Sequence, residues 1–148
     1  LSKQDYSGKV MKGSNFRKAN LSYAAFSGAN LEGCDFTGAT MLSVRMWSSN
    51  VVGAKLAGAK LAGANLSGSN FSGADLSGAD LKEANLRSVN FDNADLSGAN
   101  LENADLRFAR TGLANLDGAN LKGAKLPGSE KGQNEKEPSK KKKKKKTR

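Results

Sequence analysis

A five-residue period runs through most of this chain and never slips. Taking every fifth position from 6 to 126 gives 25 residues, and all but Thr111 are apolar. The position two residues earlier is alanine in 17 of the 25 units, and the position one residue earlier is mostly asparagine or aspartate. Of the 17 glycines, 15 stand two residues after the apolar centre. A period of five matches neither the 3.6-residue helical period nor the two-residue strand period.

A chain that turns a corner once in every five residues would keep all the apolar centres on one side. Four such sides make a square coil of 20 residues, and stacked coils would bond like neighbouring strands, about 4.7–4.9 Å apart. The glycine position supplies a residue that tolerates positive φ at a corner. The alanine position also points inward, and its small side chain leaves room for leucine or phenylalanine. The period therefore predicts an all-β solenoid.

Four of the units show the pattern clearly: 29–33 (ANLEG), 64–68 (ANLSG), 74–78 (ADLSG) and 94–98 (ADLSG). They resemble the A(D/N)LXX unit of pentapeptide-repeat proteins, and the resemblance covers about residues 4–128. It implies a right-handed quadrilateral β-helix of just over six coils, a rod of roughly 30 Å. It also implies a non-enzymatic structural or protein-interaction scaffold.

The charge divides the chain at about residue 129. The whole chain carries +10, of which residues 1–129 hold about +3 and residues 130–148 hold +7. The second segment has no large apolar residue and contains a run of seven lysines. These are Lys140, Lys141, Lys142, Lys143, Lys144, Lys145 and Lys146. We therefore expect a β-helix domain over 1–129 and a disordered basic tail over 130–148.

Composition excludes several chemistries. There is no histidine and only one cysteine, so neither a Ser-His-Asp or Cys-His catalytic group nor the usual zinc site can form. Cys34 occupies the inward small-residue position and is predicted to be a buried structural residue. We predict no enzyme activity, no cofactor and no metal site, and no apolar run is long enough to cross a bilayer.

Two places depart from the repeat. Leu42, Trp47 and Val52 occupy the outward position just after the apolar centre on successive sides of one coil, beside Arg45. Exposed tryptophan and arginine are enriched at protein contacts, so these four residues form a candidate contact patch. The alternative is a scattered set of exposed apolar residues. At Thr111 we expect a local distortion of the coil.

Residues 20 apart should stack in columns. The phenylalanines fall into two vertical pairs, Phe16 with Phe36 and Phe71 with Phe91, which should stack. The asparagines at 30, 50, 70 and 90 would form an amide ladder. Asp75 and Asp95 follow one another in another column, where paired carboxylates could serve acid–base work or hold a cation. The preferred interpretation is that these aspartates are turn residues that face water.

The leading functional hypothesis is a scaffold that binds an unidentified protein partner. Regular, loop-free members of the resembled family are frequent in cyanobacteria and plastids, so the resemblance implies a soluble plastid protein of the thylakoid lumen or membrane surface, with the cytoplasm as the alternative. The first seven residues look like a mature end after cleavage. A homodimer through an open rod end is possible.

Two other functions stay open. The lysine run would act as an electrostatic tether to nucleic acid or an anionic membrane surface. Gyrase-protecting members of the family mimic DNA with an acidic rod, which the charge of about +3 over residues 1–129 disfavours.

Overall fold

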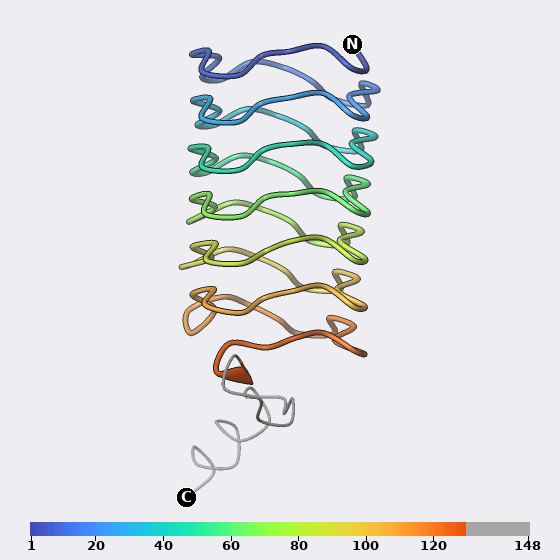
Figure 1. Cartoon of the computed structure of the whole chain (residues 1–148), viewed down its shortest axis with the longest axis vertical. Coiled ribbons are helices and arrows are strands. Elements are labelled where there is room, and N and C mark those ends of the chain that lie inside the picture. Colours follow the sequence, from blue (N-terminus) through green and yellow to red (C-terminus); the bar gives the residue numbers. More distant parts are fainter. Residues whose placement is uncertain (130–148) are drawn as a thin grey trace, which may run out of the picture.

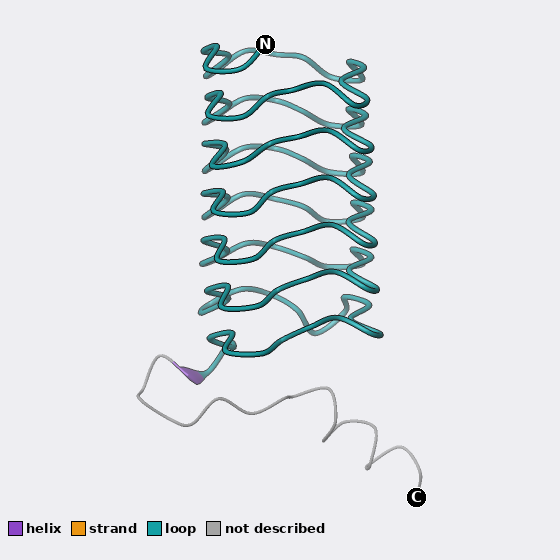
Figure 2. Ribbon diagram, turned by 90° about the vertical axis from the view of Figure 1, so that its right-hand side faces the viewer, coloured by secondary structure: helices purple, strands orange, loops and turns teal. Residues whose placement is uncertain are grey.

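The computed structural model describes residues 1–129, which wind into a straight rod of stacked coils (Figures 1 and 2). The N-terminus lies at one end of the rod, and the described chain ends at the other. The predicted basic tail over 130–148, with its run Lys140–Lys146, lies outside the described residues. The division of the chain into a domain and a tail therefore stays a prediction.

Parallel one-residue bridges join each coil to the next. They pair residues 20 apart at every fifth position, from Asp5 with Ala25 to Asp105 with Lys125. Each bridge is flanked by backbone hydrogen bonds, such as the amide of Leu76 to the carbonyl of Asp95 at 2.7 Å. Within residues 1–129 there is neither a longer strand nor an α-helix, and hence no helix that could span a bilayer. The all-β solenoid with four sides per coil is confirmed.

A tight turn forms each corner. After the Leu76 centre, for example, the Ala79 amide donates to the Leu76 carbonyl at 3.0 Å. Gly78, the third residue of this four-residue turn, has φ of 65°. A positive φ at the third turn position is what a type II turn requires. Fifteen glycines adopt it, and so do ten other residues, among them Tyr23 and Phe108. The glycine period thus marks the corners, but a corner does not require glycine.

The asparagine or aspartate before each apolar centre completes the hydrogen bonding of its turn. The turn leaves one amide, that of the residue after the centre, without a backbone acceptor. Wherever the preceding position is asparagine or aspartate, its Oδ1 accepts from that amide at 2.8–3.2 Å, as Asp75 does from Ser77. Side-chain oxygens that bond to the backbone two residues on are the mark of an Asx turn. The structure therefore supports the turn interpretation of Asp75 and Asp95.

The core is a single column of apolar side chains along the rod axis. The centres from Leu21 to Leu106 are at most 1% exposed, and the inward alanines beside them are almost as deeply buried. Phe16 and Phe36 stack with centroids 5.2 Å apart and planes 6° apart, as predicted. Phe71 and Phe91 are tilted by 44°, so the prediction of stacking is wrong for this pair. Their column neighbours are smaller, so nothing forces these two rings to lie parallel.

The predicted distortion at Thr111 is present. Leu113 is the one corner residue between positions 3 and 128 that lacks positive φ. The amide of Asn93 bonds to the carbonyl of Leu113 at 3.2 Å, one residue later than the equivalent bond in other coils. A wider orange loop marks this level of the rod (Figure 1). The ladder of bridges continues past this point to Lys125, but the core is less well covered, since Thr111 and Leu116 are partly exposed.

Candidate interaction surface

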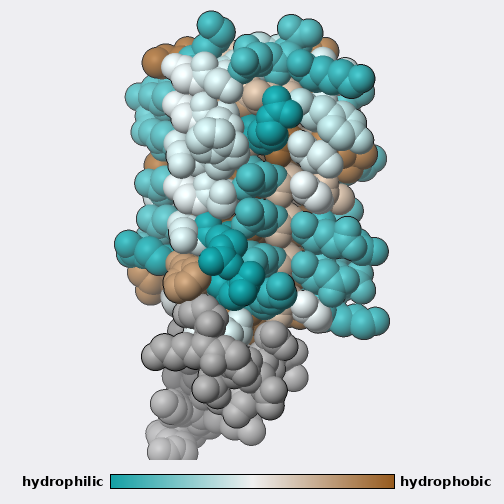
Figure 3. All heavy atoms as spheres, in the orientation of Figure 1, coloured by the Kyte–Doolittle hydropathy of each residue, from teal (hydrophilic) through white to brown (hydrophobic). Residues whose placement is uncertain are grey.

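The charged side chains of residues 1–129 lie on the outer faces, because alanine and large apolar residues fill the interior. Teal hydrophilic and white near-neutral side chains cover most of the face seen in Figure 3, and hydrophobic ones appear between them in small brown or tan patches. Within residues 1–129, no group of three or more cysteine, aspartate or glutamate residues is placed to hold a metal ion. Cys34 is fully buried, where its Sγ donates to the Met11 carbonyl at 3.0 Å and burial raises the pKa of its thiol.

The four residues of the predicted contact patch lie on three faces. Arg45 and Trp47 are exposed on the same face, and Trp47 is 46% exposed. Leu42, which is 38% exposed, lies on the preceding face, and the half-buried Val52 lies on the following one. The structure therefore brings only Arg45 and Trp47 together, and a contact role for the four residues stays a prediction.

A continuous series of outward apolar residues surrounds the rod at this level, and the predicted contact patch contained only the first three of them. The outward position after the centre is apolar in five consecutive units. The five residues are Leu42, Trp47, Val52, Ala57 and Ala62. Arg45, Lys55 and Lys60 take the asparagine or aspartate position in the same units, and residues 36–74 contain no acidic residue. Writing the sequence in rows of five would have revealed this apolar, cationic girdle.

A shallow open groove extends from Trp47 along its face of the rod. Its volume is about 440 Å³, and residues from three successive coils line it. They are Trp47, Ser48, Asn65, Ser67, Gly68, Asn85, Arg87 and Ser88. Trp47 and Arg87 stand two coils apart in one column with only Ser67 between them, so two long side chains bound the hollow and short ones form its floor.

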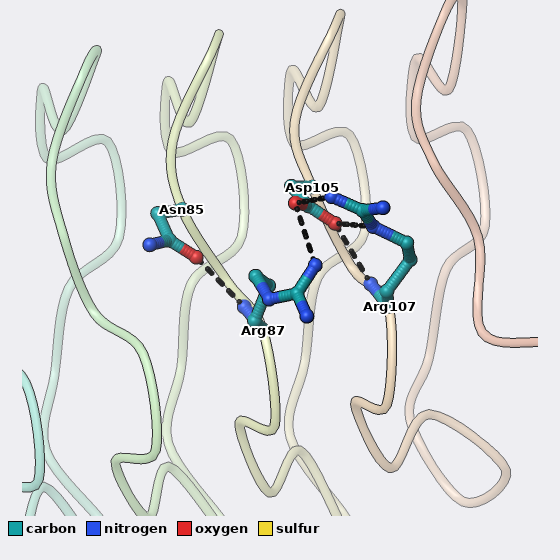
Figure 4. Close-up of polar contacts among 4 residues, drawn as sticks. All are labelled: Asn85, Arg87, Asp105 and Arg107. Carbon is teal, nitrogen blue, oxygen red and sulfur yellow. Dashed lines mark hydrogen bonds and ion pairs between the residues drawn. The ribbon is translucent and has the colours of Figure 1, made fainter. Parts of the chain in front are cut away.

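Below the groove, two arginines share one carboxylate (Figure 4). Arg107 binds Asp105 through Nε and Nη2 at 2.9 and 2.7 Å, and Arg87 reaches the same carboxylate from the coil above at 3.4 Å. The Asn85 Oδ1 accepts from the Arg87 amide at 3.1 Å. The Arg87 guanidinium also lies 5.2 Å from the ring centre of Phe108. Hydrogen bonds from Arg107 lower the pKa of Asp105 to about 2, so the carboxylate stays charged at neutral pH.

Arg87 and Arg107 were not among the residues predicted for a contact site. The repeat could have indicated them, since positions 47, 67, 87 and 107 are 20 apart and must form one column. That column reads Trp, Ser, Arg, Arg, so an aromatic residue and two cations share a face.

Two solved structures share the fold of this chain. A pentapeptide repeat protein of the Arabidopsis thaliana thylakoid lumen is 27% identical with a TM-score of 0.68, over 69% of this chain and 71% of that one. QnrB1, a plasmid-mediated fluoroquinolone resistance protein, is 21% identical with a TM-score of 0.56, over 86% of this chain and 79% of that one, which shows the fold alone. These neighbours are right-handed β-helices, the hand predicted for this chain.

A third solved structure, a pentapeptide repeat protein of Nostoc, is 36% identical over 66% of this chain and 64% of that one, with a TM-score of 0.43. No curated protein sequence matches the chain. The family described as "Pentapeptide repeats (8 copies)" matches residues 1–38, 14–56, 49–87 and 84–110. These overlapping matches, together with the 20-residue ladder, show that the chain belongs to the pentapeptide repeat family.

Proposed function

We propose that this protein is a non-enzymatic scaffold whose rod presents its side faces to a protein partner. The observation that carries the proposal is that apolar and small side chains fill the interior from Leu21 to Leu106, so the charged side chains of residues 1–129 all lie on the outer faces. Pentapeptide repeat proteins are generally non-enzymatic structural or interaction proteins. A long, stiff surface of this kind is typical of solenoids, which use their faces for binding.

Affinity capture with the full chain tests the scaffold proposal. The bait is compared with a variant whose interior is disrupted, such as Leu76→Asp, in extracts of the source cells. We expect at least one protein to be enriched in a fixed ratio by the folded bait and lost with the disrupted one. Equal capture by both baits would contradict the proposal, because binding would not then depend on the rod.

We further propose a plastid location, in the thylakoid lumen or at the thylakoid surface. Support comes from the Arabidopsis neighbour, which is a thylakoid lumen protein; other neighbours are cyanobacterial or plasmid-borne. Protease protection of the native protein in intact and lysed thylakoids tests this. If the protein were absent from the thylakoid fraction and found instead in the organelle-free extract, the cytoplasm would be favoured.

Gyrase binding by DNA mimicry has less support. The fold is shared with a fluoroquinolone resistance protein, but Arg87, Arg107 and the girdle give the described rod a positive rather than acidic character. A gyrase supercoiling assay tests this function directly, and we expect no inhibition. The alternative of an electrostatic tether depends on Lys140–Lys146, outside the described residues, and its test is the salt dependence of DNA or anionic vesicle binding.

A further inference from the structure

We propose that the groove between Trp47 and Arg87 binds an extended acidic peptide segment of a partner protein, with an apolar side chain against Trp47 and a carboxylate on Arg87. This inference rests on the proposed scaffold function and names the surface and the partner chemistry.

The charge of this face favours an anionic ligand. The residues that line the groove include one cation, Arg87, and no carboxylate, and the exposed Arg45 stands beside Trp47 on the same face. The Arg87 guanidinium is held in a fixed place, since Asp105 and the Phe108 ring both restrain its side chain. A restrained arginine loses less conformational entropy when it binds a second carboxylate.

The hydrogen-bonding groups of the groove are mostly donors. Asn65 and Asn85 each use Oδ1 to accept from a backbone amide, so the polar group that each side chain retains is the Nδ2 donor. Arg45 stands where an asparagine would close the turn, so no acceptor within residues 1–129 bonds the Trp47 amide. A ligand that matches this surface must be rich in acceptors, as a peptide with carboxylate side chains is.

The spacing fits a short extended segment. With coils about 4.8 Å apart, Trp47 and Arg87 are separated by about 10 Å along the rod. An extended chain rises about 3.4 Å per residue, so about four residues cover the distance. Trp47 supplies the aromatic anchor typical of interface centres.

Single-stranded nucleic acid fits this face less well. Its binding sites combine cations with several aromatic platforms on which successive bases stack. Here Trp47 is the one aromatic side chain that lines the groove, and the cation above the Phe108 ring already occupies a stacking position. An acidic peptide is therefore the occupant that the observations favour.

Trp47 is the only tryptophan of the chain, so its emission reports on the groove directly. The full chain is titrated with the pentapeptide Phe-Ser-Glu-Glu-Glu, and separately with Phe-Ser-Gln-Gln-Gln and with a short oligothymidylate. We expect a saturable change in Trp47 emission with the acidic peptide, and about ten-fold weaker binding for the neutral one.

Arg87→Gln and Arg17→Gln form a matched pair. Both arginines follow an apolar centre, and both reach an aspartate 18 residues later at 3.4 Å, but Arg17 lies on another face. We expect Arg87→Gln to weaken peptide binding about ten-fold and Arg17→Gln to leave it unchanged. The lysine run of the same chain also attracts acidic peptides, so this comparison, and not the wild-type affinity alone, is the readout.

The proposal is overturned if the acidic peptide leaves Trp47 emission unchanged, if the two arginine variants behave alike, or if oligothymidylate binds more tightly. A Trp47 emission that depends on protein concentration, with sedimentation showing a dimer that Trp47→Ala abolishes, would make a second copy the occupant and also overturn it. If the acidic peptide does not bind, and Arg87→Gln and Trp47→Ala baits still capture a partner, the scaffold function stands and this face is not its binding site.

Discussion

Lys60 occupies an asparagine position, and replacing it tests what that position does. The amide of Ala62, two residues later, has no acceptor within residues 1–129, whereas the equivalent amides after asparagine or aspartate are bonded at 2.8–3.2 Å. In Lys60→Asn the new Oδ1 would reach the Ala62 amide. A hydrogen bond between neutral groups contributes a net 0.5–1.5 kcal/mol, roughly, to stability.

A smaller opposing effect comes from charge. Asp80 lies directly below Lys60 in the same column, and removing a cation beside a surface carboxylate costs at most about 1 kcal/mol. We therefore expect Lys60→Asn to raise the free energy of unfolding by about 0.5–1 kcal/mol, or the melting temperature by roughly 2–4 °C. The measurement is equilibrium urea unfolding, followed by both circular dichroism and Trp47 emission to check that the rod unfolds in one step.

Lys60→Gln is the control. It removes the same charge, but its longer side chain does not place an oxygen where the turn needs it. Asn100→Ala gives the converse, since Asn100 accepts from both the Glu102 amide and the Asn120 side chain at 3.1 Å. Equal stability of Lys60→Asn and Lys60→Gln would refute the reasoning, because the position would then act through charge and not through the turn.

Three further outcomes are expected. Glu83→Gly should stabilise the rod slightly because Glu83 has φ of 60°, and Gly98→Ala should destabilise it by about 1 kcal/mol through strain alone, both measured by urea unfolding. Leu76→Ala should cost about 3–5 kcal/mol, because the ladder keeps the coils apart and the cavity cannot collapse, whereas the partly exposed Leu116→Ala should cost less than half as much. The lowered pKa of Asp105, about 2 against 3.8, means that its bonds to arginine stabilise the fold above pH 4 and are lost as the pH falls towards 2, so the stability difference between wild type and Asp105→Asn should shrink over that range in acid titrations.

The sequence was sufficient to predict the core because the period leaves only one geometry that buries every centre. Leu76 and Leu96 are fully buried, as the square coil requires. The irregular corner at Thr111 was predictable for the same reason, since a polar centre cannot fill its place in the column. Ring orientation was not predictable, because it depends on the space left by neighbours, and the tilt between Phe71 and Phe91 shows this.

The asparagine position was recognised as a turn position, but its bonding was not worked out from the sequence. Only the ladder geometry shows which amide each turn leaves without a partner, and hence that Asp75 bonds Ser77. Of the amide ladder predicted over Asn30, Asn50, Asn70 and Asn90, the described residues show one rung, from the Asn50 Nδ2 to the Asn30 Oδ1 at 3.3 Å. Both residues also make the turn bond. Similarly, the sequence identified Trp47 and missed Arg87, because a patch was sought along one coil rather than down one face.

Arg45 connects the turn bonding with the proposed binding groove. Its replacement of asparagine leaves the Trp47 amide without an acceptor in the described rod and adds a cation beside the indole. In Arg45→Asn the new Oδ1 would bond that amide, so unfolding should require more denaturant. The same change removes a donor and a charge from the groove, so the pentapeptide Phe-Ser-Glu-Glu-Glu should bind several-fold more weakly. Opposite effects on stability and binding are typical of positions where function overrides local structure. If Arg45→Asn strengthened binding as well as stability, Arg45 would not be a binding residue, and if it weakened both, no turn bond would have been gained. Either result would refute the link between the two roles.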